Sequence, residues 1–227
     1  MPLTHRKPRP LSRDKQTFRD DRLFIIACDD TYAPKQYFEF FRIPRIHVHV
    51  VPTTDGTSAA QAVLNRLLEY AHQEQDERWL LLDTDHAIRG PHIKQFLAAL
   101  QTACQQGINV AVSRPCFELW LLLHHVEETD VGGLLDCSAV DARLREVLGT
   151  YNKTNLVAQQ YSLASISQAC ARAQRLESVS GGGDVPERNT TRVFNIWTSI
   201  CQKALPSQLP RELRELTPKS STAGPLV

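Results

Sequence analysis

The sequence has little net charge and no long apolar run. The net charge of its 227 residues is +1, so the composition as a whole does not indicate a nucleic-acid partner, and any such binding must come from local patches. No segment reaches the ~18–20 consecutive apolar residues that a membrane helix needs. The basic, proline-rich start is not followed by the apolar stretch of a secretory signal. We therefore expect no association with a membrane.

Paired cysteines are also missing. The six cysteines form no CxxC pair, and several of them lie inside apolar runs. That distribution is typical of reduced thiols in a cytoplasmic protein and argues against a disulfide framework or a zinc site. Hydrophobic residues make up 42% of the chain and charged residues 22%, which is the composition of a globular protein. The expected location is the cytoplasm.

The chain divides into four expected segments. A basic, disordered tail covers residues 1–20, an α/β domain covers 21–128, a helical extension covers 129–204 and a proline-rich flexible tail covers 205–227. Strand patterns stop after about residue 130, whereas helical periodicity continues. The helices expected in the extension cover residues 138–149, 154–177 and 190–203.

The α/β domain is inferred from four apolar runs that are each followed by a helical pattern. The expected strands cover residues 23–28, 46–51, 79–82 and 108–112. The expected helices cover residues 34–42, 57–73, 91–105 and 116–125. Repetition of this βα unit implies a parallel four-stranded sheet with helices on both faces, as in Rossmann-like folds.

Polar residues follow three of these strands directly. Asp29 follows the first, Asp83 and Asp85 follow the third, and Ser113 follows the fourth. Ligands of parallel sheets bind beyond the carboxyl ends of the strands. We therefore expect these side chains to meet along one edge of the sheet.

Asp83 and Asp85 are the strongest candidates for chemistry. Two carboxylates at one strand end repel each other, but they become favourable around Mg²⁺ (or Mn²⁺), a hard cation that takes carboxylate oxygens. Asp29 would supply a third oxygen ligand. A metal held there can activate water and neutralise charge on a phosphodiester. The alternative is a solvated turn in which an Asp caps the next helix.

Other polar residues allow two interpretations each. Glu118 lies in an apolar helix and either faces the acidic edge or forms an ion pair, for example with Arg114. Lys153 either meets a phosphate or is solvated. Three histidines are ligand or proton-transfer candidates, although the last two also suit a helix C-terminus as imidazolium: His86, His124 and His125. Four arginines of the helical half give a weak signal for a basic face: Arg172, Arg175, Arg188 and Arg192.

Residues 112–124 (VSRPCFELWLLLH) resemble the RloB-like family, a TOPRIM-domain group linked to bacterial abortive infection and phage defence. The family has a similar string that reads SNPCFELWLLLH. The resemblance extends from about residue 22 to 200 and includes, in order, residues 56–58 (GTS), the LDTD sequence at 82–85 and residues 151–153 (YNK).

The resemblance implies a TOPRIM fold whose metal-binding acids include Asp83 and Asp85. The first acid departs from the family, because Asp29 stands where a Glu is usual, and Arg114 replaces an Asn. Asp29, as the third ligand, then also carries the role of general acid or base, with Asp30 as a substitute. The catalytic set implied is Asp29, Asp83, Asp85 and Glu118, with Ser113, Arg114 and Lys153 as substrate contacts.

The function that the resemblance implies is an Mg²⁺-dependent endonuclease that acts on RNA or DNA in anti-phage defence, with an ATPase partner of the AAA or ABC type. The alternative is a catalytically weakened TOPRIM module that binds nucleic acid or a partner protein. A phospho-signalling receiver and a haloacid dehalogenase-type phosphatase fit the spacing of the acids less well. The sequence leaves the oligomeric state open, and a homo-oligomer is compatible with it.

Overall fold

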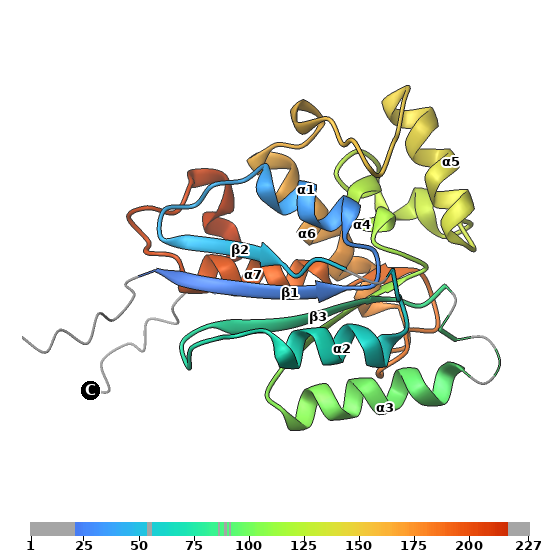
Figure 1. The fold of residues 1–227 in the computed structure, drawn as a ribbon. Coiled ribbons are helices and arrows are strands. Elements are labelled where there is room, and N and C mark those ends of the chain that lie inside the picture. Colours follow the sequence, from blue (N-terminus) through green and yellow to red (C-terminus); the bar gives the residue numbers. More distant parts are fainter. Residues whose placement is uncertain (1–20, 54–55, 86, 89, 91, 218–227) are drawn as a thin grey trace, which may run out of the picture.

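The computed structural model describes residues 21–53, 56–85, 87–88, 90 and 92–217 (Figure 1). Five strands form one sheet in the order β2-β1-β3-β4-β5. Neighbours among the first four are parallel, and β5 is antiparallel to β4. The strands are β1 (Arg22–Cys28), β2 (Ile46–Val50), β3 (Glu77–Asp83), β4 (Asn109–Arg114) and β5 (Thr190–Thr191).

Helices cover both faces of this sheet. In Figure 1, α2 and α3 lie on one side, and α1, α4, α6 and α7 lie on the other. The helices are α1 (Tyr32–Glu39), α2 (Ala60–Glu69), α3 (His92–Gln105), α4 (Glu118–Leu122), α5 (Cys137–Leu148), α6 (Leu163–Ser178) and α7 (Val193–Lys203). Short 3₁₀ helices are η1 (Glu128–Val131), η2 (Ala158–Gln160) and η3 (Arg211–Leu216). None of the helices in these described ranges is long and apolar enough to cross a membrane.

The unbroken apolar strands are explained by this double cover. Ile25 and Leu80 face the core under α2 and α3, whereas Phe24 and Leu81 face the core on the opposite side of the sheet. Because both faces are buried, every position of the central strands favours an apolar side chain, and no alternation with polar residues is seen. The predicted α/β class is confirmed, with a sheet that is mostly parallel.

The larger core is organised around Tyr37 of α1. Its hydroxyl lies 3.0 Å from Nε2 of His124, whose Nδ1 lies 2.8 Å from the Ser165 hydroxyl of α6. Burial lowers the pKa of His124 well below its usual value, so the ring is neutral and not the imidazolium expected at a helix end. Seven rings lie with centroids 5.2–6.2 Å from that of Tyr37: Phe38, Phe41, Phe117, Trp120, His124, Tyr161 and Trp197.

The sheet has one strand more than the sequence predicts. Thr190 and Thr191 were expected to start a helix, but they pair with Arg114 and Ser113 as β5. A strand of two residues leaves no alternation pattern, so the count of four strands is wrong for a physical reason. The Ser113 and Thr191 hydroxyls, 2.9 Å apart and both buried, hold the two strands together.

Several expected helices are shorter than predicted, and the one expected at 57–73 covers only Ala60–Glu69. The apolar segment at 116–125 is helical only from Glu118 to Leu122. The segment from residue 154 becomes an α-helix only at Leu163, where the Ser162 and Ser165 side chains form a capping box. The preceding loop carries residues 151–156, which is important for the site described below.

The described part of the expected C-terminal tail, residues 205–217, packs on the protein. Leu209 and Leu213 are buried in the larger core, and the Ser167 hydroxyl donates a hydrogen bond to the Glu212 carbonyl at 2.8 Å. These contacts show that residues 205–217 are packed, whereas the proline content had predicted a flexible tail. The expected N-terminal tail, residues 1–20, lies outside the described residues, and the division into domains stays a prediction.

Replacement of Leu213 by alanine tests this packing. We expect Leu213→Ala to lower the free energy of unfolding by about 2–5 kcal/mol, because the side chain is fully buried between helices. Leu205→Ala is the matched control, since Leu205 is 44% exposed in the same segment. This substitution should change the free energy of unfolding by about 0.5 kcal/mol or less. Urea unfolding measures both. Equal effects would show that the segment does not pack as described.

Candidate functional site

A cavity of about 970 Å³ lies beyond the carboxyl ends of β1, β3 and β4, and the residues that line it are mostly polar. Its walls come from these strand ends, from α1, α3 and α5, and from the loop before α6. Among the described lining residues, Lys153 carries the only Lys or Arg charge. Six carboxylic acids line it: Asp29, Asp30, Asp83, Asp85, Glu118 and Asp141.

Asp29 and Asp83 are brought together by neighbouring parallel strands. Cys28 at the end of β1 pairs with Leu81 of β3, so Asp29, the residue after β1, lies beside the end of β3 at Asp83. The Asp83 amide donates to Oδ2 of Asp29 at 3.2 Å, and the Asp30 amide donates to Oδ1 at 3.2 Å. Both oxygens of Asp29 are therefore oriented by the backbone.

The loop that carries Asp83 and Asp85 is tied to the turn after β4. The Thr84 amide donates to the carbonyls of Ser113 at 3.0 Å and Pro115 at 3.1 Å. The Asp85 amide also donates to Pro115, at 3.2 Å. These bonds hold the loop while the Asp83 and Asp85 side chains line the cavity.

Burial shifts the protonation of the two central acids. It raises the pKa of Asp29 to about 6, although backbone hydrogen bonds oppose the shift. It raises the pKa of Asp83 well above its usual value, and the negative charges of Asp29 and Glu118 add to the effect. Oδ1 of Asp83 is buried and has no hydrogen-bond partner in the part of the chain that the structure describes. The strand ends thus concentrate negative charge that the described protein groups do not compensate.

Glu118 faces the acidic cavity and not Arg114. It is the first residue of α4, it is buried, and the Tyr151 hydroxyl donates to its Oε1 at 3.1 Å. Burial raises the pKa of Glu118. Arg114 instead donates from Nη1 to the Pro186 carbonyl at 2.6 Å. The sequence left two alternatives for Glu118, a position facing the acidic edge or an ion pair with Arg114. The geometry favours the first alternative.

Lys153 reaches the cavity from the helical half of the chain. Its Nζ lies 2.9 Å from Oδ2 of Asp30. Gln36 of α1 fixes the loop, because its Nε2 donates to the Lys153 carbonyl at 2.9 Å and its Oε1 accepts from the Leu156 amide at 2.9 Å. The YNK segment therefore contributes both Tyr151 and Lys153 to the same cavity.

The structure brings together Asp29, Asp83, Asp85, Glu118 and Lys153, but not the other predicted contacts. Ser113 is buried against β5, and Arg114 turns toward the loop at 186; neither lines the cavity. His86 lies outside the described residues. Three of the four arginines of the expected basic face form ion pairs instead, namely Arg172 with Glu127, Arg175 with Glu128 and Arg192 with Glu177.

Some residues of the site were not found by sequence reasoning. Gln36 and Asp141 lie on ordinary amphipathic helices and carry no local signal for a site. Cys116 and Cys137 also line the cavity, and no spacing in the sequence relates them to each other. Of these four residues, Cys137 and Asp141 reach the strand ends because the chain returns to the sheet after residue 130.

The chemistry of these residues fits a hard divalent cation. Within the described ranges, no three His, Cys, Asp or Glu side chains already stand in the arrangement of a metal site. Nevertheless, the Asp83 oxygen without a partner is buried beside Asp29, and carboxylate oxygens are the ligands that Mg²⁺ and Mn²⁺ prefer. Asp29, Asp83 and Asp85 are the residues that would hold such an ion.

The raised pKa values predict how stability depends on pH when no metal is added. The folded state binds protons at Asp29 and Asp83 more tightly than the unfolded chain. The free energy of unfolding should therefore fall as pH rises from about 4 through about 6. Asp83→Asn should reduce this fall and stabilise the metal-free protein at pH 7 by about 1–3 kcal/mol. Thermal unfolding at several pH values measures the effect, and Asp130→Asn, an exposed acid, is the control. A destabilised Asp83→Asn protein would contradict the burial of an uncompensated charge.

A comparison with protein-family models gives a match that covers all the acids of this site and Lys153. The model described as RloB-like protein matches residues 24–200, a range that includes every acid of the cavity and Lys153. No curated protein and no solved structure matches the chain. The family match confirms the resemblance of the 112–124 segment and covers more than half of the sequence. The chain therefore belongs to the RloB-like family.

Proposed function

We propose that this protein is a TOPRIM-type endonuclease that requires Mg²⁺ or Mn²⁺ and cleaves RNA or DNA in bacterial anti-phage defence. The observation that carries the proposal is the pair of half-buried acids at the strand ends, Asp29 and Asp83, with one buried Asp83 oxygen that has no partner among the described residues. Asp85 and Glu118 line the same cavity.

The energetics of the acids support a cation at this place. A buried carboxylate without a compensating partner costs several kcal/mol, and repulsion between neighbouring acids adds to that cost. Such an arrangement is kept in a protein where a functional ion offsets it, and strongly shifted acids in a cavity are characteristic of functional sites. A merely structural role would favour neutral residues at these strand ends.

Each residue then has a distinct task. When bound, a divalent cation supplies charge neutralisation at a phosphodiester and a water of lowered pKa. Asp83, Asp85 and Asp29 hold the ion. Burial raises the pKa of Asp29 to about 6 when no ion is bound, and the resemblance to TOPRIM domains gives this carboxylate the further role of general acid or base. Glu118, oriented by the Tyr151 hydroxyl, faces the ion-binding acids and helps to organise them.

Lys153 is the candidate for phosphate binding. Its side chain is about half exposed and paired with Asp30, so its ammonium group stands at the cavity without being buried. A phosphate can replace part of the Asp30 contact with little loss, because an exposed ion pair contributes only about 0–1 kcal/mol. The proposal also includes an ATPase partner of the AAA or ABC type, which would hold or release the nuclease.

One observation favours the second candidate, a weakened module that binds nucleic acid or a partner protein without cleavage. Asp29 is shorter than the Glu usual in the family, and both its oxygens accept backbone hydrogen bonds from Asp30 and Asp83. Those bonds compete with a metal for the same oxygens. Cleavage assays separate the two candidates directly.

Asp83 is the residue whose loss should abolish cleavage. We expect purified protein with Mg²⁺ or Mn²⁺ to nick RNA or DNA, and Asp83→Asn to lower the rate about 100-fold or more. Asp130→Asn should cleave as the wild type does. Equal activity of Asp83→Asn and wild type would sink the nuclease proposal. Binding without cleavage in the wild type would favour the module, and labelling of Asp83 by acetyl phosphate would favour a receiver.

Asp29 is tested by substitution with the family's usual acid. Asp29→Glu should keep Mg²⁺-dependent thermal stabilisation and cleave at least as fast as the wild type, because it restores the longer carboxylate. Asp29→Asn should lose both properties, with cleavage reduced about 100-fold. The stabilisation by Mg²⁺ is a readout that does not depend on activity. If Asp29→Asn behaves as the wild type in both measurements, Asp29 takes no part in the site.

A further inference from the structure

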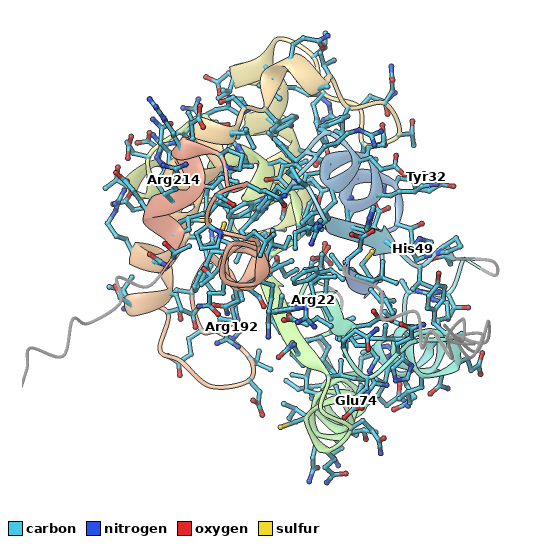
Figure 2. All side chains as sticks on the ribbon, turned by 90° about the vertical axis from the view of Figure 1, so that its left-hand side faces the viewer. Arg22, Tyr32, His49, Glu74, Arg192 and Arg214 are labelled. Carbon is cyan, nitrogen blue, oxygen red and sulfur yellow. The ribbon has the colours of Figure 1, made fainter. Side chains whose placement is uncertain are left out.

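Tyr32 is an exposed aromatic residue at the cavity. It is the first residue of α1, its side chain is 60% exposed, and it lines the cavity next to Asp30. Within the described part of the chain, its ring packs against no other aromatic ring, whereas Tyr37 of the same helix contacts seven. Figure 2 shows the Tyr32 side chain extending outward at the margin of the molecule.

The backbone beneath this ring is held firmly. The Tyr32 amide donates to Oδ1 of Asp30 at 2.9 Å, and its carbonyl accepts from Nε2 of Gln36 at 2.9 Å. The root of the side chain is therefore fixed while the ring itself is accessible. An aromatic ring presented in this way offers a flat apolar face to a ligand at low entropic cost.

The same two residues that hold Tyr32 also hold Lys153. The second oxygen of Asp30, Oδ2, accepts from the Lys153 Nζ at 2.9 Å, and Gln36 accepts from and donates to the loop that carries this lysine. Asp30 and Gln36 thus place a ring and an ammonium group on the same side of the cavity. A planar apolar group beside a fixed positive charge is complementary to a nucleotide, which has a flat base and a phosphate.

We propose that Tyr32 and Lys153 form a subsite for an unpaired nucleotide, in which the ring stacks on the base and the ammonium group contacts the phosphate. The substrate class is then single-stranded nucleic acid, or a single-stranded segment of a folded one. This inference rests on the proposed function and specifies its substrate. A base inside a duplex has both faces covered by its neighbours, so it has no free face for Tyr32.

The shape and charge of the site support a single strand. The acids that would act on the phosphodiester, Asp29 and Asp83, are half-buried and line the cavity, and they do not lie on a flat surface. The cavity volume of about 970 Å³ is at the upper end of ligand pockets, which span about 300–1,000 Å³, and it suits nucleotides better than a duplex. Duplex binding relies on many free phosphate-binding cations, but Arg172, Arg175 and Arg192 are engaged by acids.

Fluorescence anisotropy with labelled oligonucleotides tests the subsite without the need for cleavage. The probes are a single-stranded RNA, a single-stranded DNA and the duplex of the same sequence, with Ca²⁺ in place of Mg²⁺. We expect single strands to bind at least tenfold more tightly than the duplex. Comparison of the two single strands shows whether a 2′-hydroxyl contributes.

Variants of the two residues make the test specific. Tyr32→Ala should weaken single-strand binding about 5- to 150-fold, which corresponds to the usual contribution of stacking on one base. Tyr32→Phe keeps the ring and is the matched control, with binding within about twofold of the wild type. Lys153→Gln should weaken binding and reduce the salt dependence by about one phosphate contact. With a probe that lacks the base at the stacked position, Tyr32→Ala should have no further effect.

The outcomes separate this inference from the proposed function. Equal binding of duplex and single strands, or equal single-strand binding by folded Tyr32→Ala and wild type, overturns the subsite. If Asp83→Asn abolishes cleavage while Tyr32→Ala changes nothing, the nuclease stands and the subsite falls. If single strands bind through Tyr32 but the wild type does not cleave, the subsite stands and the nuclease falls.

Discussion

The convergence of carboxylates at the ends of two neighbouring parallel strands is the constraint on which the rest of this structure depends. Asp29 follows β1 directly, Asp83 is the last residue of the neighbouring β3, and the Asp29 carboxylate accepts a hydrogen bond from the Asp83 amide. Burial raises the pKa of both acids, so the folded chain bears a cost in the absence of a compensating ion. The well-packed cores on both faces of the sheet supply the stability that offsets this cost.

The helical half of the chain completes the site and is not a separate attachment. Tyr151 donates to Glu118, and Lys153 pairs with Asp30, so two acids of the cavity are partnered from beyond residue 150. The helices α6 and α7 of this helical half pack in the same core as one face of the sheet. A change in the position of the helical half would therefore alter both the acids and their surroundings. An external partner that acts on that half could regulate the site by this route.

Local patterns predicted the sheet and the acids because both depend on neighbours in the sequence. A buried strand is an apolar run, and Asp83 and Asp85 follow one immediately, so their place at a strand end required no tertiary information. β5 escaped prediction because two residues carry no period. Two of the hydrogen-bond partners of Gln36 lie more than 100 residues away, and Arg114 bonds to a carbonyl 72 residues distant. Contacts of this kind are set by packing, and no single-sequence pattern encodes them.

The short side chain of Asp29 connects the stability of the fold with the chemistry of the site. A Glu would carry its carboxylate one methylene farther into the cavity, whereas Asp29 remains close enough to the backbone to accept the amides of Asp30 and Asp83. Those two bonds lower the pKa of Asp29 and oppose the effect of burial. The shorter acid therefore stabilises the junction of β1 and β3, and it leaves less of its bonding capacity for a metal. Asp83, by contrast, has one buried oxygen with no partner among the described residues, so the protein itself satisfies the carboxylate of Asp29 more fully than that of Asp83.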